Sequence, residues 1–235
     1  MNKGVIYYTD NKLGEPIFTI VQKQISKAGL PITSVSLKPI DFGNNEVFDG
    51  IPSYLTMIEQ ITSCLERSTA TYVFFCEHDV LYPKSHFDFT PPKEDIFFYN
   101  SHVWRWKYLS NTVIGYDRLI SLSSLCANKN FVLDHYKKRL KKIEKMGDEK
   151  NGRDPYWARK WGYEPGTKKR RRGGFSDDDF ETWRSKYSII DIRHPQTFSP
   201  TKVTLKEFRY QPTGWKEMSI DDIPGWNLKQ LFGFI

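Results

Sequence analysis

Short apolar runs alternate with segments of helical period through the first hundred residues, and this alternation constrains the fold more than any other feature. The apolar runs predict strands at 4–11, 32–37, 71–76 and 95–100. Helices are expected over 15–29 and from Ser53 onward, where Ser53 would cap the helix, and the segment 38–52 before it would be a loop. Nearly continuous apolar strands that alternate with helices predict an α/β domain with a central, mostly parallel mixed sheet flanked by helices.

The second half of the chain departs from simple alternation. We expect a strand or turn near 112–117, a basic helix over 130–146, a long loop over 148–174, a short helix over 177–185 and a strand over 187–192. We further expect residues 1–200 to form a single domain, divided into halves at about 1–100 and 101–200. The aromatic segment 201–235 would be a C-terminal extension that packs on the same domain.

Positive charge is concentrated in one part of the sequence. Of the net charge of +7, residues 129–186 carry 18 Lys or Arg against 10 Asp or Glu, and the rest of the chain is nearly neutral. This asymmetry favours an anionic partner for that segment: nucleic acid, an anionic glycan, a membrane surface or a phosphorylated ligand. The charge pattern alone does not choose among them.

The cysteines and the absence of long apolar segments bear on the compartment. The three cysteines are widely spaced and form no C-x-x-C pair, so the sequence predicts neither a disulfide framework nor a structural zinc site. There is no run of about 18 apolar residues and no apolar stretch at the N-terminus typical of a signal peptide. We therefore expect a cytoplasmic protein without a transmembrane segment.

Polar residues follow two of the predicted strands directly. Thr9, Asp10 and Asn11 end the first strand, and the triplet Glu77-His78-Asp79 ends the buried strand at 71–76. In open α/β sheets, ligands bind outside the carboxyl ends of the strands, where side chains and loop amides converge. Two carboxylates at positions i and i+2 can share a divalent cation or divide the work between a cation and a sugar hydroxyl. Solvated loop acids would give the same pattern.

An apolar strand that ends in an acidic-x-Asp triplet, after a strand–helix–strand–helix order, resembles the nucleotide-sugar-dependent glycosyltransferases of the GT-A fold. The resemblance is to family-2-like enzymes, and Glu77-His78-Asp79 is an E-x-D variant of their D-x-D motif. It implies a nucleoside-diphosphate-sugar donor and a Mn²⁺ or Mg²⁺ ion held by Asp79. Glu77 would contact the donor ribose or the metal shell, and His78 would lie at the donor. The halves 1–100 and 101–200 would then bind donor and acceptor.

The resemblance also implies a third metal ligand and a general base. His194 follows the strand at 187–192 and is the candidate ligand; a loop histidine with a purely structural role is the alternative. Inverting enzymes of this fold use a carboxylate to deprotonate the acceptor hydroxyl. Asp178 is the first candidate for this base, with Asp179 and Asp177 close behind and Glu164 as an outside candidate. Three acids at a helix start are also what the helix dipole alone favours.

Further residues match the donor side of the family by position. The resemblance places the nucleotide against the loop after the first strand and an acid after the second; these residues are Tyr8, Thr9, Asp10, Asn11 and Asp41. The basic run 168–172 would close over the diphosphate, where Arg171 and Arg172 would stabilise the leaving group. The excess of cations suggests an anionic acceptor, either a glycan or a modified nucleic acid on whose bases or sugars tryptophans stack. The candidates for stacking are Trp104, Trp106, Trp157 and Trp161, which would otherwise belong to the core.

Two rival functions use the same residues. A metal-dependent nuclease would employ Glu77, Asp79 and His194 and hold DNA or RNA on the basic segment, but it lacks a second carboxylate cluster or a nearby lysine. A non-catalytic nucleic-acid-binding protein would account for the basic segment, but its strand-end carboxylates would repel phosphate. The sequence therefore predicts a metal-dependent, inverting glycosyltransferase that transfers a sugar to a hydroxyl acceptor, with these two functions as alternatives.

Overall fold

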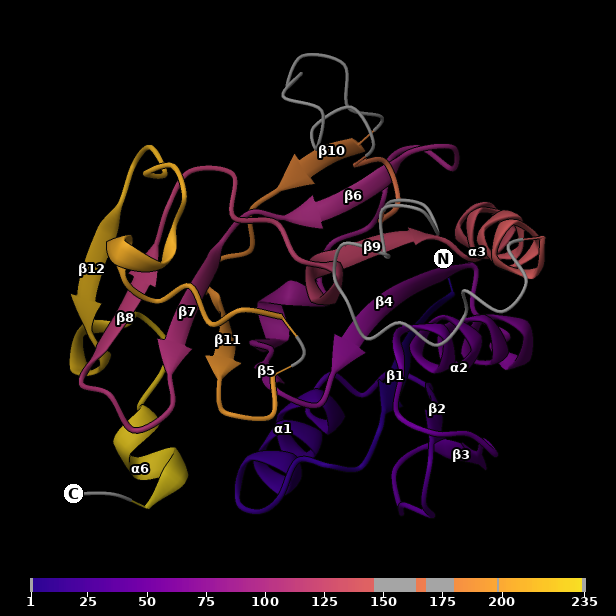
Figure 1. The fold of residues 1–235 in the computed structure, drawn as a ribbon, viewed down its shortest axis with the longest axis horizontal. Coiled ribbons are helices and arrows are strands. Elements are labelled where there is room, and N and C mark those ends of the chain that lie inside the picture. Colours follow the sequence, from indigo (N-terminus) through magenta and orange to yellow (C-terminus); the bar gives the residue numbers. More distant parts are fainter. Residues whose placement is uncertain (1, 146–163, 168–179, 198, 234–235) are drawn as a thin grey trace.

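The chain folds around two β-sheets that stand side by side (Figure 1). The computed structural model describes residues 2–145, 164–167, 180–197 and 199–233. Within them, the larger sheet has seven strands in the order β10 (Phe180–Trp183), β6 (Phe97–Asn100), β9 (Leu125–Asn128), β4 (Tyr72–Glu77), β1 (Lys3–Thr9), β2 (Ile32–Ser36) and β3 (Asn44–Val47). The smaller sheet has five, in the order β12 (Lys216–Ser219), β8 (Thr112–Gly115), β7 (Val103–Lys107), β11 (Ile189–Arg193) and β5 (Val80–Leu81).

The larger sheet is the mixed, mostly parallel sheet that the alternation of strands and helices predicts. Strand β1 pairs in parallel with β2 and β4, and the pairs β2–β3 and β10–β6 are parallel as well. Strand β9 is antiparallel to both of its neighbours, β4 and β6. The predicted fold class, a mixed α/β fold with helices flanking a central sheet, is confirmed. The second sheet was not predicted.

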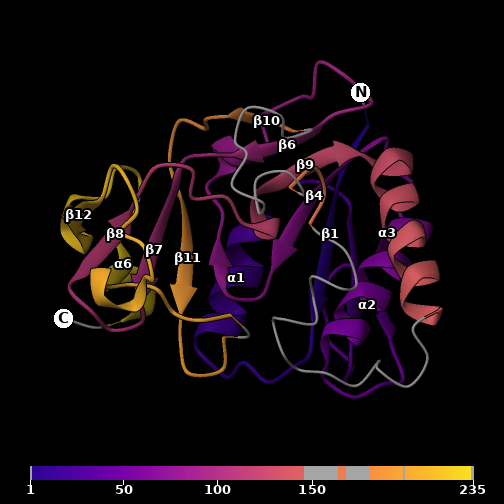
Figure 2. The ribbon, with the colours of Figure 1, turned by 45° about the horizontal axis from the view of Figure 1, so that its top comes forward.

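Helices cover both faces of the larger sheet (Figure 2). Along β1, Ile6 and Tyr8 point to a core shared with α2 and α3, whereas Val5 and Tyr7 point to a core shared with α1 and the smaller sheet. Because both faces are covered, β1 and β4 have no polar face, and their sequences read as continuous apolar runs. The α-helices are α1 (Ile17–Ser26), α2 (Tyr54–Arg67), α3 (Lys129–Glu144) and α6 (Leu228–Phe232), and the 3₁₀ turns are η1 (Lys84–His86), η2 (Leu122–Ser124), η4 (Leu205–Glu207) and η5 (Ile220–Asp222).

The helix signals read from the sequence agree with the structure. Ser53 caps α2 as predicted, with its side chain accepting a hydrogen bond from the amide of Thr56 at 3.0 Å. Helix α3 begins at Lys129, the first residue of the basic segment, after Asn128, whose side chain accepts from the amides of Asn130 and Phe131. Its few buried positions face α2, and most of its lysines are exposed. The positive charge of α3 therefore lies on a solvent-exposed face of an otherwise ordinary helix.

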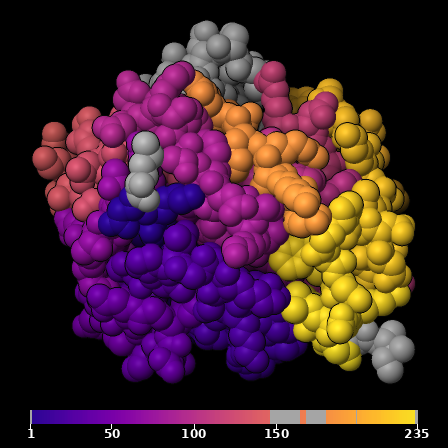
Figure 3. Space-filling model, turned by 180° about the vertical axis from the view of Figure 1, so that it is seen from behind, coloured from indigo at the N-terminus to yellow at the C-terminus, as the bar shows by residue number. Residues whose placement is uncertain are grey.

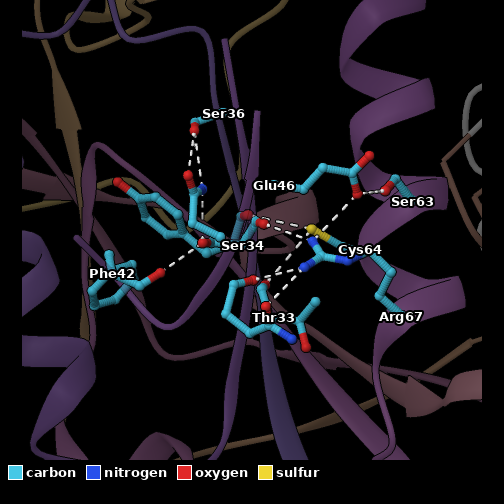
Figure 4. A network of polar contacts seen from close by, with 11 residues as sticks. Thr33, Ser34, Ser36, Phe42, Glu46, Ser63, Cys64 and Arg67 are labelled. Carbon is cyan, nitrogen blue, oxygen red and sulfur yellow. Dashed lines mark hydrogen bonds and ion pairs between the residues drawn. The ribbon is translucent and has the colours of Figure 1, made fainter. Parts of the chain in front are cut away.

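Two local predictions were wrong. The segment 38–52 was expected to be a loop, but its residues Asn44–Val47 form the edge strand β3. Polar contacts explain the pairing: Asn45 donates to the hydroxyl of Ser34 at 3.0 Å, and Arg67 of α2 bonds the backbone of Ser34 and Asn44. Figure 4 shows Ser34 and Arg67 within this network of polar contacts. The predicted helix over 177–185 is contradicted at its described residues, because Phe180–Trp183 is strand β10, with Phe180 and Trp183 in aromatic contacts.

The chain passes between the two sheets at the predicted acidic triplet. Strand β4 of the larger sheet ends at Glu77, and β5 of the smaller sheet begins at Val80. The amide of Ile192 in β11 donates to the carbonyl of Asp79 at 2.9 Å, and β11 pairs with β5. These bonds bring the end of β11, and with it His194, to the end of β4.

The C-terminal segment completes the smaller sheet. Strand β12 pairs with β8 at the outer edge of that sheet, and α6 packs against α1. Figure 3 shows this segment in yellow at one end of the molecule, next to the indigo N-terminal region. Residues 201–233 therefore share a core with the N-terminal half of the chain.

Candidate metal centre

A pocket of about 560 Å³ opens at the carboxyl ends of β1 and β4. The two strands are parallel neighbours with Tyr8 opposite Glu77, so the loops that follow them emerge at the same edge of the sheet. Thr9, Asp10 and the whole triplet Glu77-His78-Asp79 line this pocket. The structure thus brings together the two strand-end groups that the sequence singles out.

Three side chains in the described residues have ligand atoms within 4.8 Å of one another: His78, Asp79 and His194. Nε2 of His194 lies 3.3 Å from Oδ2 of Asp79. Both residues are buried, with 4% and 8% of their surface exposed. Imidazole suits Zn²⁺ and similar first-row ions, and carboxylate suits Mn²⁺ and Mg²⁺, so this mixed set is compatible with a divalent cation.

The orientation of His194 fits a metal ligand. Its Nδ1 lies 3.2 Å from Oε1 of Gln196, a carbonyl oxygen that can only accept a hydrogen bond. Nδ1 can donate a proton to this oxygen, which leaves Nε2, on the side of Asp79, as the nitrogen that a cation would contact. Nε2 is buried and makes no hydrogen bond of good geometry in the described residues. A buried nitrogen of this kind, beside a carboxylate, is what a cation would satisfy.

Electrostatics couple the two buried residues. Burial alone would lower the pKa of His194, but contact with Asp79 and its charge outweigh burial and raise that pKa. Burial alone would raise the pKa of Asp79, but His194 and His78 together outweigh burial and bring that pKa below its usual value. Asp79 is therefore an ionised carboxylate ready to accept a cation.

Glu77 occupies a different position from the one expected of a metal ligand. Its Oε1 accepts a hydrogen bond from the hydroxyl of Tyr8 at 2.6 Å, and it is not one of the three residues whose ligand atoms converge. Burial, followed by the charge of Asp79, raises the pKa of Glu77 to about 8. His78, expected at the donor, is one of the three residues whose ligand atoms converge, whereas Glu77 is not.

The loop after β1 divides into a pocket-facing part and a structural part. Thr9 and Asp10 line the pocket, and Oδ1 of Asp10 accepts from the amide of Lys12 at 3.1 Å. The hydroxyl of Thr9 accepts from the amide of Asn11 at 3.0 Å and lies 2.8 Å from Nδ1 of His78. Gln60 of α2 donates to the carbonyl of Thr9 at 2.9 Å and fixes it from behind.

Two expected donor residues lie away from the pocket. Oδ1 of Asn11 accepts from the amides of Leu37 and Lys38, at 2.7 and 2.9 Å, and its backbone is left-handed with φ +56°. Its side chain thus joins the loop after β1 to the end of β2. Asp41 is exposed in the loop before β3 and does not line the pocket. The second strand therefore brings no acid to this site.

Several expected site residues lie outside the described part of the chain. These are the candidate bases Asp177, Asp178 and Asp179, the basic-run residues Arg171 and Arg172, and Trp157 and Trp161. Of the other two tryptophans, Trp106 is fully buried in the core between the smaller sheet and Phe232, so it is not available for stacking. Trp104 is half-buried and packs against the same core.

Glu164, the outside candidate for a base, lines the pocket but is held by protein donors. The hydroxyl of Tyr54 donates to its Oε1 at 2.7 Å, and Nη1 of Arg139 lies 3.3 Å from its Oε2. The next residue is anchored as well, because the hydroxyl of Tyr99 donates to the carbonyl of Pro165 at 2.7 Å. Glu164 therefore joins the short segment 164–167 to α2 and α3 at the pocket wall.

Sequence reasoning missed a row of buried charges on the opposite wall. Arg105, Asp191 and Arg193 are each less than 10% exposed and line the pocket. The signal was present in the sequence, since both "VWRWK" and "IIDIR" place charged residues at every second position of an apolar strand. Such spacing puts the charges on one face of a sheet. With the smaller sheet unpredicted, that face had no known neighbour.

Comparisons with known proteins add structures but no family. No protein-family model and no curated protein matches the sequence. A glycosyltransferase involved in glycosylation of the major capsid of PBCV-1 superposes with a TM-score of 0.45 at 8% identity, over 78% of this chain and 82% of that one. The apo form of the glycosyltransferase GlyE from Streptococcus pneumoniae TIGR4 gives 0.39 at 11% identity, over 63% and 40%.

A third solved structure is of a differently named protein. The bifunctional IspDF from Campylobacter jejuni superposes with a TM-score of 0.36 at 12% identity, over 90% of this chain and 55% of that one. At these TM-scores the likenesses carry no argument about family or reaction. Among the described residues, no helix has the length and apolar character needed to cross a membrane. Functional inference therefore rests on the pocket itself.

Proposed function

We propose that this protein is a metal-dependent, inverting glycosyltransferase that moves a sugar from a nucleoside-diphosphate donor to a hydroxyl acceptor. One observation carries the proposal: Asp79, His78 and His194 converge within 4.8 Å beside a pocket of about 560 Å³, at the carboxyl ends of parallel strands. This is the edge of an α/β sheet where ligands bind. The E-x-D triplet that supplies Asp79 is also the motif on which the resemblance to GT-A enzymes rests.

In this proposal the residues of the chain divide the work between them. Asp79 and His194 hold a Mn²⁺ or Mg²⁺ ion, with His78 as a further ligand; the ion, when bound, supplies positive charge to the diphosphate leaving group. Thr9 and Asp10 line the nucleotide side of the pocket. Tyr8 holds Glu77 in a fixed orientation, from which it reaches the donor ribose or a water on the ion.

The proton of the acceptor hydroxyl needs a base. We keep Asp178, with Asp177 and Asp179, as the proposed base, and Arg171 and Arg172 as the proposed cations over the diphosphate. Glu164 is less suited to proton transfer because Tyr54 and Arg139 already engage both of its oxygens. A nuclease that uses two metal ions is less well supported, since the candidate metal group in the described residues has only three members.

The proposal is tested by adding UDP-, GDP- and dTDP-sugars to the protein with and without Mn²⁺, and following both the melting temperature and slow hydrolysis of the donor. We expect at least one donor to raise the melting temperature only when Mn²⁺ is present. Asp79→Asn should abolish this response, whereas Asp88→Asn, an exposed acid remote from the pocket, should keep it.

A response to no donor, or a response that survives in Asp79→Asn, would contradict the proposal. Cleavage of DNA or RNA in the absence of any nucleotide sugar would favour the nuclease instead. Circular dichroism of both variants controls for folding, because Asn retains the shape of the Asp79 side chain.

A further inference from the structure

The pocket has a second charged group on the wall formed by the smaller sheet. Strands β7 and β11 are parallel, and Asp191 lies directly opposite Arg105 in their register. Side chains alternate along a strand, so Arg105, Asp191 and Arg193 share one face. Nε of Arg105 lies 3.1 Å from one oxygen of Asp191, and Nε of Arg193 lies 3.2 Å from the other.

The charges in this row do not balance. Two guanidinium groups share a single carboxylate, and all three side chains are at most 10% exposed. Arg193 has further neighbours: its Nη1 donates to the hydroxyl of Ser199 at 3.0 Å, and its charge also acts on Asp79. Arg105 has no other acidic partner in the described residues, and its Nη1 is a buried donor without a hydrogen-bond acceptor. Buried cations are normally fully paired, so this donor indicates a missing anion.

The surroundings of Arg105 favour a ligand over a purely structural role. Its guanidinium lies 5.7 Å above the ring of Tyr116, which holds the plane of the group in place. Tyr116 in turn contacts Phe208 and Trp215, at centroid distances of 5.3 and 6.3 Å. These three rings are half-buried and extend from Arg105 toward the C-terminal segment. The rings do not line the pocket, so they hold Arg105 from behind and leave its guanidinium on the pocket wall.

This wall is separate from the nucleotide side of the pocket. Thr9 ends β1 of the larger sheet and Asp10 follows it, whereas Arg105 lies in β7 and Tyr116 directly follows β8 of the smaller sheet. Figures 1 and 2 show β7 and β8 on the far side of β11 from β1. A donor on the β1 side and a second substrate on the β7 side would meet near Asp79.

We propose that Arg105, held by Asp191 and backed by Tyr116, binds a carboxylate or phosphate group of the acceptor. That the ligand is the acceptor rests on the proposed function, whereas binding of an oxyanion by Arg105 does not. Arginine suits this task because its planar fork can donate two parallel hydrogen bonds to an oxyanion. Asp191 neutralises one guanidinium and orients the other, so it acts as a positioning residue.

Inorganic sulfate is the probe, because it presents tetrahedral oxygens and does not precipitate Mn²⁺. Calorimetric titration at constant ionic strength should give saturable binding to the wild-type protein, weakened at least about tenfold in Arg105→Gln. Arg105→Lys should give an intermediate affinity, because charge is kept and the fork is lost. Arg209→Gln, at an exposed arginine, is the matched control and should bind as the wild type does.

Arg105→Lys also guards against misfolding, since it preserves the charge opposite Asp191; both variants are first compared with the wild type by urea denaturation. Equal sulfate affinity in the wild type and in both folded Arg105 variants would overturn the subsite.

The second arm separates acceptor from donor. Sulfate is titrated again with Mn²⁺ and a saturating nucleoside diphosphate, UDP, GDP or dTDP, whichever binds. Sulfate affinity that is unchanged by the nucleotide supports an acceptor subsite. Loss of sulfate binding on adding the nucleotide would overturn it, because the row would then hold the donor's diphosphate. If no nucleotide binds, the proposed function fails, whereas sulfate binding that depends on Arg105 would still support the oxyanion subsite.

Discussion

The two sheets carry their polar residues in different places. In the larger sheet, β1 and β4 are apolar along most of their length, and the side chains of interest lie at or just after the last strand residues, at Thr9 and at Asp79. In the smaller sheet, Arg105 and Asp191 lie within the strands themselves, on the face that lines the pocket. A sheet that is covered on both faces has to place its chemistry at its ends, whereas a sheet with one face on a pocket can place it along a strand.

The largest expected effect concerns the charged row of the smaller sheet. Asp191→Ala leaves two buried guanidinium groups without their shared carboxylate, which we expect to cost about 3–5 kcal/mol of unfolding free energy. Urea denaturation of the purified variant measures it. A loss below about 1 kcal/mol would show that the row is solvated, and the contrast between the two sheets would disappear.

The next effect concerns the junction at which the chain returns from the smaller to the larger sheet. His86 lies in η1 between β5 and β6, is fully buried, and has one ring nitrogen 3.1 Å from the side-chain amide of Asn100. Burial lowers the pKa of His86 to about 3. In the unfolded chain, the imidazole of His86 binds a proton near pH 6.5. The contribution of buried, neutral His86 to stability is therefore fully present above pH 6.5 and is lost as the pH falls toward 3.

The measurement compares wild type with His86→Phe, which cannot titrate. Between pH 7 and pH 5 the wild type should lose about 2 kcal/mol more than the variant. Urea denaturation at the two pH values gives this difference, and any constant cost of the substitution cancels. Equal losses would mean that water reaches His86 and that the junction is open.

The smallest effect sharpens the comparison within the larger sheet itself. Ser53→Ala removes the side-chain cap of α2 and should cost about 1 kcal/mol. Helix α1 on the opposite face has no side-chain cap, so Ser26→Ala at its exposed C-terminal end is the matched control and should change stability by less than about 0.5 kcal/mol. Thermal or urea unfolding of the two variants measures the difference. Equal costs would indicate that α2 is held by its packing alone.

Strands β1, β2, β4 and β6 of the larger sheet could be predicted from the sequence, and the physical reason is their burial on both faces. Continuous apolar strands and regular amphipathic helices leave few alternatives, so β1, α1, β2, α2 and β4 follow from local patterns. The smaller sheet could not be predicted in this way, because β5 has only two residues and β7 pairs with β11, about 85 positions later in the chain. The short strand β3 was missed for a similar reason, since polar contacts with Ser34 and Arg67 hold it.

The site residues that could be predicted are likewise those that follow strands readable from local patterns. Asp79 and its neighbour His78 could be located because they follow a readable strand, and His194 because it follows another. What the sequence could not provide is the hydrogen bond from Ile192 to Asp79, which depends on two strands that are far apart in the chain. Nor could it show that Glu77 bonds Tyr8 and that the imidazole of His78 turns toward the ligand atoms.

The hydroxyl of Thr9 has a thermodynamic consequence. It contacts the amide of Asn11 in the loop after β1 and Nδ1 of His78, so one oxygen joins this loop to the candidate metal ligands. A ligand that shifts this loop therefore changes the orientation of His78, and a cation that fixes His78 restrains the loop. Thermodynamic linkage requires that the cation and the second ligand change each other's affinity by the same factor.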